Sequence, residues 1–426
     1  MDIKALKKEF LNCECGMEHK CGIEEVCIGS GIVKDTGEIL KRNGFGKKLL
    51  VVADKITLKV SQGIEQALKD FDVTYQVYDS FRVPTMEAVE FIQSLLKDLD
   101  GVISIGTGSL NDIARLAAFR ENKKLALFAT ASSMDVFASY NAPIVNNGFK
   151  ITYPAKSPEV VIGDTKILAA APAGLKSAGF GDMVAKYIGF IDWEVSHLIT
   201  GEHFCKKVED LSRVAVDKVM SVADKITSTD ESAAAEIFEA LLLTGIAMNF
   251  VNCARPAAGC EHTMAHYIEC AELKDGVIPN YHGKDVGVTT LIIMRYYQSL
   301  ANLKAIACHK ENLDIEDICL NAPALAKDIR KSFVPDNITD AIAPEKMLEN
   351  WDNIVKIIKS VPTAEQMKDA MIKAGCAVTV SDIGKNRDLV IEALKYHSYM
   401  RRRFSLLRLT GLLDFDGEVD LDYVVE

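Results

Sequence analysis

The sequence has no excess of basic residues. Its 426 residues include 49 Lys and Arg against 60 Asp and Glu, which gives a formal net charge of −11. A protein that binds nucleic acid needs a basic surface to neutralise phosphates, so this composition argues against such a partner. A small anionic substrate remains compatible with it, because a site needs only local positive charge.

Long uninterrupted apolar runs are also missing. The most apolar stretch, Phe238–Val251, contains Thr244, Gly245 and Asn249, and it is shorter than the ~20 residues that a membrane span needs. We therefore expect a buried core helix there and no membrane span. The first residues, MDIKALKKEF, lack the apolar core of a signal peptide, and a cytoplasmic location is expected.

A regular cysteine framework is absent. The 11 cysteines are an odd number scattered along the chain, which is typical of a reducing cytoplasm rather than of a disulfide scaffold. Several of them crowd near the N-terminus around one histidine, at Cys13, Cys15, His19, Cys21 and Cys27. This group contains no CxxC pair, and two interpretations stay open: a structural zinc site, or free thiols in a capping segment.

Strand and helix patterns alternate through the first part of the chain. Lys47–Asp54 is a basic start followed by an apolar, β-branched run, which predicts a buried parallel strand. Further strands are predicted at Val73–Asp79, Gly101–Gly106 and Leu125–Thr130, and helices at Ile56–Phe71, Thr85–Leu99 and Ser109–Glu121. The alternation predicts an α/β fold with a doubly wound parallel sheet. Residues 142–164 suggest an antiparallel hairpin appended to that sheet.

From about Gly174 the pattern changes to successive Ala-, Leu- and Ile-rich helices. They are predicted at Glu231–Val251, Gly287–Ala301, Ala364–Ala374 and Arg387–Leu409. The chain is too long for one ordinary core. We predict a dinucleotide-binding α/β domain at residues 1–165, which includes the Cys-rich segment, and an all-helical domain for metal and substrate at residues 166–426. The acidic end, DFDGEVDLDYVVE, is expected to be solvated, and the apolar helical domain favours a homodimer.

Three of the 8 histidines lie in or near one stretch. His262 and His266 lie four residues apart in CEHTMAH, so they share one face of a predicted helix. His282 follows in a Pro/Gly/Asn-rich connection that indicates a turn, and Asp182 supplies a carboxylate where another predicted helix opens. Such a set predicts a site for a divalent transition metal, against the alternative of unrelated helical and loop histidines.

The glycine-rich phosphate fingerprint is incomplete. Gly106-Thr107-Gly108-Ser109 follows a predicted strand and opens a helix, where glycines let the backbone approach a pyrophosphate, but the third glycine is missing. Asp54 ends the first predicted strand, where a carboxylate can accept both ribose hydroxyls of an adenosine and repel a 2′-phosphate. Its alternative role is to cap the next helix. The hydroxyl-rich segment Thr130–Ser133 ends another strand. Three such loops at one edge predict a dinucleotide, with NAD(H) preferred over NADP(H).

Five segments in this order resemble the iron-containing alcohol dehydrogenase superfamily: GTGSLND, TASSMDVFASY, GFGDMVAK, ARPAAGCEHTMAH and YHG. Within it, the early CxCGxxH stretch and RPAAGCEH are most similar to the bacterial sn-glycerol-1-phosphate dehydrogenase subgroup. The resemblance implies that Asp182, His262 and His282 hold the metal, with nickel, zinc or iron as candidates. It also implies that His266 and Asp135 face the substrate as catalytic residues.

The same resemblance implies a set of residues that contact the cofactor: Asp54, Gly106, Gly108, Ser109, Leu110, Asn111, Asp112, Thr130, Ala131, Ser132, Ser133 and Ser139. The sequence departs from the family pattern at Asn111, where a histidine is familiar, and at Cys260, where Ser or Ala is common. Neither position carries chemistry.

The implied activity is the NAD(P)H-dependent reduction of dihydroxyacetone phosphate to sn-glycerol 1-phosphate, which would serve glycerophospholipid synthesis. The metal would act as a Lewis acid, and His266 would relay a proton. Arg255, Lys186 and Lys284 are candidate phosphate ligands, although each could equally be an ordinary surface charge. The alternatives are a glycerol-type polyol dehydrogenase, a dehydroquinate synthase-like lyase and a non-enzymatic dinucleotide sensor.

Overall fold

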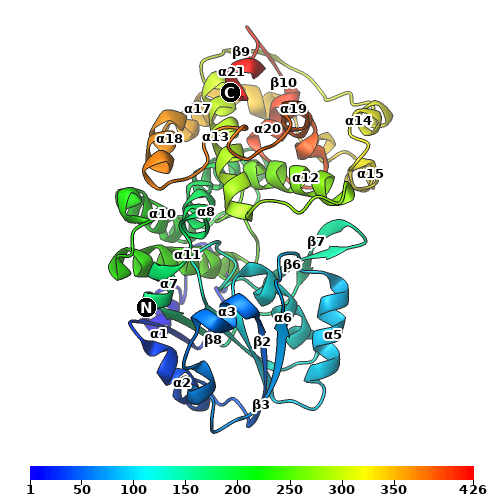
Figure 1. Cartoon of the computed structure of the whole chain (residues 1–426). Coiled ribbons are helices and arrows are strands. Elements are labelled where there is room, and N and C mark those ends of the chain that lie inside the picture. The colour runs from blue at the N-terminus through cyan, green and yellow to red at the C-terminus, as the bar shows by residue number, and fades with distance from the viewer.

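A six-stranded, wholly parallel sheet forms the centre of the N-terminal half of the molecule (Figure 1). The computed structural model describes residues 1–426. The strand order is β1-β8-β5-β4-β2-β3. The strands are β1 (Glu25–Gly29), β2 (Lys48–Asp54), β3 (Asp72–Tyr78), β4 (Gly101–Gly106), β5 (Lys124–Ala129) and β8 (Val160–Asp164). The doubly wound parallel sheet predicted from the sequence is confirmed.

Helices cover both faces of this sheet because its inner strands bury side chains on both sides. Along β2, Leu50 and Val52 pack in the core that holds α5 and α6, whereas Leu49 and Val51 pack in the core that holds α2 and α4. The helices of this half are α1 (Ile3–Glu9), α2 (Thr36–Arg42), α3 (Lys55–Val60), α4 (Ile64–Ala67), α5 (Met86–Leu96), α6 (Gly108–Arg120) and α7 (Thr165–Ala170).

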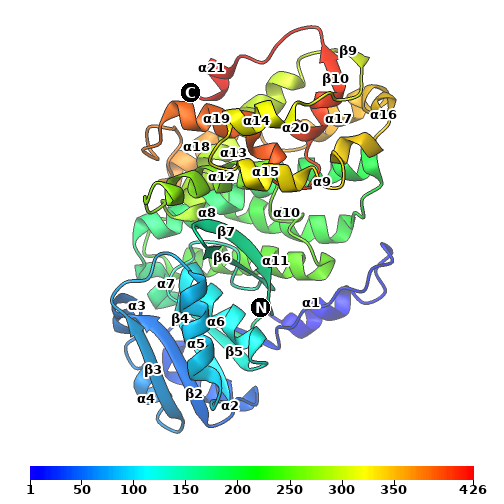
Figure 2. The same cartoon turned by 90° about the vertical axis from the view of Figure 1, so that its right-hand side faces the viewer.

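The rest of the chain is almost entirely helical and forms the other half (Figures 1 and 2). Its helices are α8 (Ala173–Val184), α9 (Lys186–Thr200), α10 (Lys206–Ser221), α11 (Glu231–Val251), α12 (Cys260–Lys274), α13 (His282–Leu300), α14 (Ile315–Asn321), α15 (Ala326–Ser332), α16 (Pro344–Glu349), α17 (Trp351–Ile358), α18 (Ala364–Lys373), α19 (Arg387–Tyr396), α20 (Leu406–Leu409) and α21 (Leu421–Val424). Two short strands, β9 (Ala305–Cys308) and β10 (Leu413–Phe415), pair antiparallel.

Helix α11 packs in both halves. Its Phe238 and Leu242 pack in the core that holds α5 and α6 on one face of the sheet, whereas Ile237 and Leu241 pack in the helical core. By length and composition α11 could cross a membrane, but 78% of its apolar window is buried inside the fold. This burial agrees with the core helix predicted from the interrupted apolar stretch Phe238–Val251. The domain division at residue 165 stays a prediction, since α11 belongs to both cores.

Several predicted elements need correction. The helix predicted at residues 56–71 is two short helices, because Gly63 adopts a left-handed conformation (φ 96°) between them. The hairpin of β6 (Asn141–Asn146) and β7 (Phe149–Pro154) is a sheet of its own, and β8 is a parallel strand between β1 and β5. The helix predicted over residues 387–409 breaks after Tyr396. The acidic end is not simply solvated, since it bears α21 and buries Val424 and Val425 in the helical core.

Candidate active site

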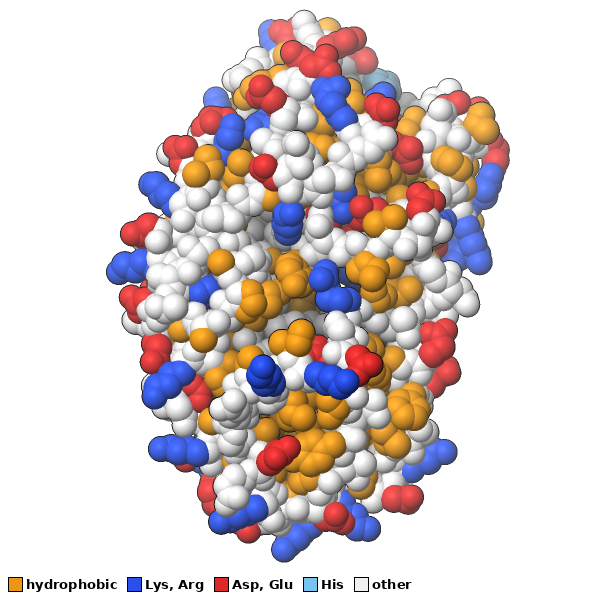
Figure 3. Space-filling model, viewed as in Figure 1, with side chains coloured by type: hydrophobic (Ala, Val, Ile, Leu, Met, Phe, Trp, Pro, Cys, Tyr) orange, Lys and Arg blue, Asp and Glu red, His pale blue; other side chains and the backbone are white.

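A cavity of about 290 Å³ lies between the two halves. Its lower wall comes from the β4–α6 turn, the segment after β5 and the β6–β7 hairpin, and its upper wall comes from α12, the start of α13 and the segment after α19. The space-filling view shows a hollow at the junction of the halves, with apolar and basic side chains around it (Figure 3). This is the carboxyl edge of the sheet, where open α/β sheets bind ligands.

The structure brings Asp182, His262 and His282 together, with His262 and His282 in the cavity lining and Asp182 buried behind them. One ligand atom of each lies within 4.8 Å of the others, and His262 Nε2 is 3.2 Å from Asp182 Oδ1. They come from α8, α12 and α13. Two positions differ from those predicted, because Asp182 lies near the C-terminal end of α8 and His282 is the first residue of α13 rather than a loop residue.

Close contact between α8 and α13 explains this convergence. A Cβ atom on Gly283 would lie 1.9 Å from the carbonyl oxygen of Ala178, and a Cβ atom on Gly181 would lie 2.4 Å from the carbonyl oxygen of Gly283. Only glycine lets the two backbones approach this closely. The adjacent residues, Asp182 and His282, are thereby held next to each other.

Carboxylates behind the two histidines orient their rings. His262 Nδ1 lies 2.6 Å from Glu261 Oε1, and His282 Nδ1 lies 2.7 Å from Glu269 Oε1. Each Nδ1–H can donate to its carboxylate, which leaves Nε2 free to face a cation, as in carboxylate–histidine–metal arrangements. Burial lowers the pKa of His262, but hydrogen bonds to Asp182 and Glu261 outweigh it and raise that pKa to about 9. The cluster therefore favours positive charge, and its donors fit a divalent transition metal.

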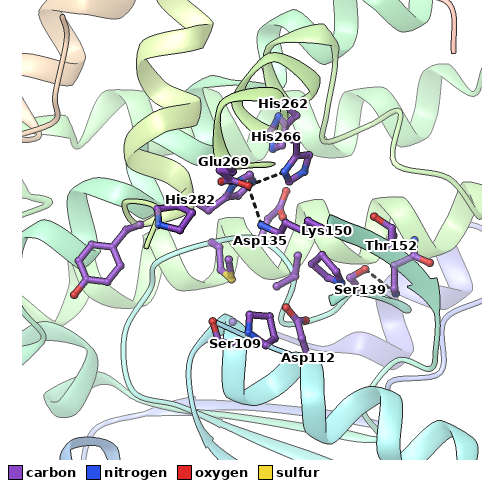
Figure 4. A pocket seen from close by; sticks show the side chains of 18 of the residues that line it. Ser109, Asp112, Asp135, Ser139, Lys150, Thr152, His262, His266, Glu269 and His282 are labelled. Carbon is purple, nitrogen blue, oxygen red and sulfur yellow. Dashed lines mark hydrogen bonds and ion pairs between the residues drawn. The ribbon is translucent and has the colours of Figure 1, made fainter. Parts of the chain in front are cut away.

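His266 lies one turn further along α12 and meets different partners (Figure 4). Its Nδ1 is 2.9 Å from Glu269 Oε2, and its ring stacks on His282 with centroids 4.9 Å apart. Burial lowers the pKa of His266 well below its usual range despite the neighbouring Glu269. His266, Glu269 and His282 could also form a metal-binding group. However, Glu269 already accepts from both rings and pairs with Lys150 at 3.0 Å, so the Asp182 set is the better donor group.

Asp135, predicted to face the substrate, lines the cavity. The fully buried Lys186 pairs with it, since the Lys186 Nζ lies 2.6 Å from Asp135 Oδ2 and 3.3 Å from Asp182 Oδ1. The backbone N–H of Asp135 donates to Asp182 Oδ2 at 2.9 Å. Burial raises the pKa of Asp135, and the charge of Asp182 raises it further. Lys186 is thus an internal partner of two carboxylates and not a wall residue, which removes it as a phosphate ligand.

Five of the predicted cofactor residues line the cavity: Gly108, Ser109, Asp112, Ser133 and Ser139. The others do not line it. Among them, Asn111 is buried and accepts a hydrogen bond from Ser104 at 2.8 Å, a contact that holds α6 against β4. Their cofactor roles stay predictions.

Asp54 lies at the end of β2, outside the cavity lining. Its Oδ1 accepts from the backbone N–H groups of Ile56 and Thr57, and the Thr57 hydroxyl accepts from the Asp54 N–H, a complete capping box. The capping interpretation is therefore correct. The cap uses only Oδ1 of the Asp54 carboxylate. A contact between Asp54 and the adenosine ribose therefore stays a prediction.

The prediction that Arg255 binds the substrate is wrong. Its Nε donates to Glu202 Oε1 at 2.7 Å, Nη1 donates to the Phe404 carbonyl at 2.7 Å, and Nη2 donates to Ser196 Oγ at 3.2 Å. The guanidinium is buried and fully engaged, and it does not line the cavity. Lys284 does not line it either.

Other cations line the cavity that sequence reasoning missed: Arg82, Lys150, Arg401 and Arg403. Lys150 is paired with Glu269, and Arg403 donates to the Ala258 carbonyl. The half-buried guanidinium of Arg401 makes no hydrogen bond or ion pair with the rest of the chain, and desolvation lowers its pKa. A half-buried guanidinium that lines a cavity and has no partner in the chain is free to bind an anionic ligand through charge-assisted hydrogen bonds. The available signal in the sequence was the run of three arginines at positions 401–403.

Comparisons with known proteins identify the family and the fold of the chain. The family model described as iron-containing alcohol dehydrogenase matches residues 27–172. A glycerol-1-phosphate dehydrogenase (NAD(P)+) of Thermococcus sibiricus is 32% identical over 327 residues, which are 76% of this chain and 90% of the relative. The chain belongs to the glycerol-1-phosphate dehydrogenase family. A family member from Halalkalibacterium halodurans, also named glycerol-1-phosphate dehydrogenase (NAD(P)+), is 29% identical over 414 residues, covering 95% of this chain and 96% of its own.

Solved structures of more distant proteins share the fold of this glycerol-1-phosphate dehydrogenase family member. A 1,3-propanediol oxidoreductase matches with a TM-score of 0.63 at 15% identity, over 96% of this chain and 98% of that one. An archaeal alcohol dehydrogenase from a Red Sea brine pool matches with a TM-score of 0.62 at 15% identity, over 95% and 96% of the two chains. At this identity the likeness shows a common fold alone.

Proposed function

We propose that the protein reduces dihydroxyacetone phosphate to sn-glycerol 1-phosphate with NAD(P)H, using a divalent metal held by Asp182, His262 and His282. The observation that carries the proposal is that a metal-type cluster and the unpaired Arg401 face one cavity, at the edge of a sheet suited to a dinucleotide. Relatives named for this activity match over most of the chain.

The chain's own residues hold the reactants and move one proton. When bound, the dinucleotide supplies the hydride and the metal polarises the substrate carbonyl. His266 lines the cavity, and its Nδ1–H donates to Glu269, which leaves Nε2 as the proton-accepting atom. In the oxidative direction Nε2 takes the alcohol proton, and in the reductive direction it returns that proton to the oxygen. Asp135, paired with Lys186, lies beside the metal cluster as a second substrate-facing group.

Arg401 and Arg403 are the residues that we assign to the substrate phosphate. Both line the cavity and come from the segment after α19. Guanidinium groups bind phosphate oxygens through paired, charge-assisted hydrogen bonds. The Arg401 side chain has no partner elsewhere in the chain, so a phosphate would satisfy its free donors. A substrate without phosphate would leave them unsatisfied.

The finer parts of the proposal rest on fewer contacts. Asp54 favours NADH over NADPH through repulsion of a 2′-phosphate. Imidazole and carboxylate donors suit Ni²⁺ or Zn²⁺, with Fe²⁺ as the third candidate. We also propose a cytoplasmic homodimer with an N-terminal cofactor domain and a helical metal and substrate domain.

Steady-state oxidation of NADH with dihydroxyacetone phosphate, compared with dihydroxyacetone, tests the activity. We expect kcat/KM to be about 30-fold or more higher for the phosphorylated substrate, since a charge-assisted hydrogen-bond contact is worth roughly 2 kcal/mol. Equal efficiency with both substrates would instead indicate a polyol dehydrogenase. No net NADH oxidation with either would indicate a lyase or a sensor.

The Arg401→Met variant tests the phosphate assignment. It should raise KM for dihydroxyacetone phosphate and leave turnover of dihydroxyacetone almost unchanged, because only the phosphorylated substrate uses the guanidinium. Arg402→Met is the neighbouring control, since Arg402 donates to the Ser332 carbonyl and to Asp336 outside the cavity. Equal losses with both substrates would contradict a phosphate-binding role for Arg401.

A further inference from the structure

A second group of metal-type side chains lies outside the active-site cavity. It consists of Cys13, Cys15, His19 and Cys205, whose ligand atoms all lie within 4.8 Å of one another. The Cys13 and Cys205 sulfurs are 3.7 Å apart, and His19 Nε2 is 3.3 Å from the Cys15 sulfur and 3.6 Å from the Cys205 sulfur. Cys205 comes from the turn between α9 and α10, far along the chain from the other three.

These spacings match a tetrahedral zinc site. With Zn–S bonds of about 2.3 Å and Zn–N bonds of about 2.0 Å, tetrahedral geometry places neighbouring ligand atoms roughly 3.5 to 3.8 Å apart. A disulfide between Cys13 and Cys205 would instead need their sulfurs about 2 Å apart. The observed 3.7 Å agrees with two ligands of one ion.

Contacts around Cys13, Cys15 and His19 orient these three residues. His19 Nδ1 lies 2.7 Å from the Phe250 carbonyl oxygen, to which it can donate, so Nε2 is the nitrogen that faces the sulfurs. The backbone N–H of Met17 donates to the Cys15 sulfur at 3.5 Å. Gly16, with φ 79°, bends the chain back so that its N–H donates to the Cys13 carbonyl. This turn brings Cys13 and Cys15 to the same side.

We propose that Cys13, Cys15, His19 and Cys205 bind a structural zinc ion. Three thiolates and one imidazole are a closed donor set of the Cys3His type, with no open position for substrate. Cys21 and Cys27, their neighbours in sequence, lie elsewhere. Cys21 contacts Asn249 at 3.7 Å, and Cys27 contacts Glu25 and Arg42 in and beside β1.

The ion would fasten the N-terminal segment to the helical half. Figure 2 shows this segment running beside α11, and Phe10 packs on Phe250 with ring centroids 4.5 Å apart. Phe250 follows Met248, which lines the active-site cavity. Between them, Asn249 donates to the Ala138 carbonyl at 2.7 Å, next to the cavity residue Ser139. The zinc site would therefore support the end of α11, which contributes Met248 to the cavity lining.

Elemental analysis of a protein whose catalytic cluster is disabled tests this site. In a His262→Ala/His282→Ala background we expect about one zinc ion per chain to remain. Adding Cys205→Ser should remove it, whereas the matched control Cys21→Ser should keep it. Because the background cannot use the catalytic ligands, the result does not depend on the proposed activity.

Cobalt substitution gives a second readout in the same background. A Cys3His site should show strong thiolate-to-cobalt charge-transfer absorption, which Cys21→Ser keeps and Cys205→Ser loses. If Cys205→Ser does not fold, the cobalt spectrum of the parent protein, His262→Ala/His282→Ala, still decides whether thiolates bind the metal. The proposal is overturned if the folded parent protein binds no zinc and shows no thiolate–cobalt band, if Cys21→Ser loses the ion as Cys205→Ser does, or if mass spectrometry of the freshly purified protein finds a Cys13–Cys205 disulfide.

Discussion

At the scale of single residues, His262 and His266 project from one face of α12 but meet different partners. His262 faces Asp182, whereas His266 is held by Glu269. His262→Ala should therefore lose the active-site metal and all turnover. His266→Ala should keep the metal and lower mainly kcat, by roughly 10²- to 10⁴-fold, the usual contribution of a positioned proton-transfer group. Elemental analysis together with steady-state kinetics separates the two.

A His262→Ala protein that retains its full catalytic metal would contradict the proposed ligand set. Identical behaviour of the two variants would show that the division of roles between the histidines is wrong. The Cys3His group must be counted separately in both proteins, since its zinc should be unaffected.

The sequence predicted which side chains are chemically able to bind a metal, but not which charges are already paired. Clustering of rare histidines was enough to select His262 and His282. Arg255 looked equally available, yet its partner Glu202 comes from another segment and contacts it only in the folded chain. Cys205 was missed for the converse reason. It lies far from CECGMEHKC in sequence and joins that stretch only in three dimensions.

At the scale of elements, the packing of α8 on α13 sets the metal geometry. Gly283→Ala would place its Cβ atom 1.9 Å from the Ala178 carbonyl oxygen, so the two helices must separate. We expect His282 to move away from Asp182 and metal affinity to fall, at a stability cost of roughly 1 to 3 kcal/mol. Gly174→Ala in α8, the helix that Gly283 of α13 packs against, is the control, because its Cβ atom would meet no heavy atom within 4 Å. Metal titration and denaturant unfolding measure both effects, and unchanged metal affinity in Gly283→Ala would remove this explanation.

The junction of β2 and α3 carries the cofactor prediction. Asp54→Asn keeps a side-chain oxygen for the helix cap but removes the negative charge. We expect the kcat/KM ratio of NADPH to NADH to rise roughly tenfold, the scale of one lost repulsive contact, with little change in stability. Asp54→Ala should shift the ratio similarly and also cost about 1 kcal/mol through loss of the cap. If the kcat/KM ratio of NADPH to NADH is unaltered in both variants, Asp54 only caps α3 and does not contact the cofactor.

Elements with a clear apolar run or hydrophobic periodicity could be predicted from the sequence. Elements whose position depends on pairing or packing with other segments could not. The apolar run of β4 and the long pattern of α11 were placed with the same bounds as in the structure. By contrast, β8 was assigned to a hairpin because residues 142–164 share a composition rich in Pro, Gly, Asn and Val, and only its pairing with β1 and β5 shows that it belongs to the central sheet. The burial of Val424 and Val425 was likewise not predicted, because the acidic composition of the C-terminal end indicates a solvent-exposed segment.

At the scale of the whole molecule, the candidate site exists only where the two halves meet. Lys150 of the hairpin reaches Glu269 of α12, and Arg82 donates to the Pro279 carbonyl at 3.2 Å. Both contacts join the halves across the cavity. Sequence patterns predict the layers of each half, but they carry no information on how the halves face each other. This is why the cations that line the cavity were not foreseen.

His397 couples the stability of the helical half to pH. Burial lowers its pKa to about 4, although its Nδ1–H donates to the Ala393 carbonyl at 2.8 Å. As pH falls below its usual value of 6.5, the unfolded chain takes up the proton first. The stabilisation is therefore complete above pH 6.5 and is lost progressively toward pH 4, by about 3 kcal/mol at most.

His397→Gln should remove this pH dependence, because glutamine can still donate to the Ala393 carbonyl but does not titrate. Denaturant unfolding at pH 6.5 and at pH 4 gives the loss of stability for each protein. Buried carboxyls such as Asp112, whose pKa burial raises to about 7, act in the opposite sense in wild type and variant alike. The difference between the two proteins therefore isolates His397. Exposed His203 supplies the control, since His203→Gln should behave as wild type. Parallel losses in wild type and His397→Gln would show that this histidine does not link pH to folding.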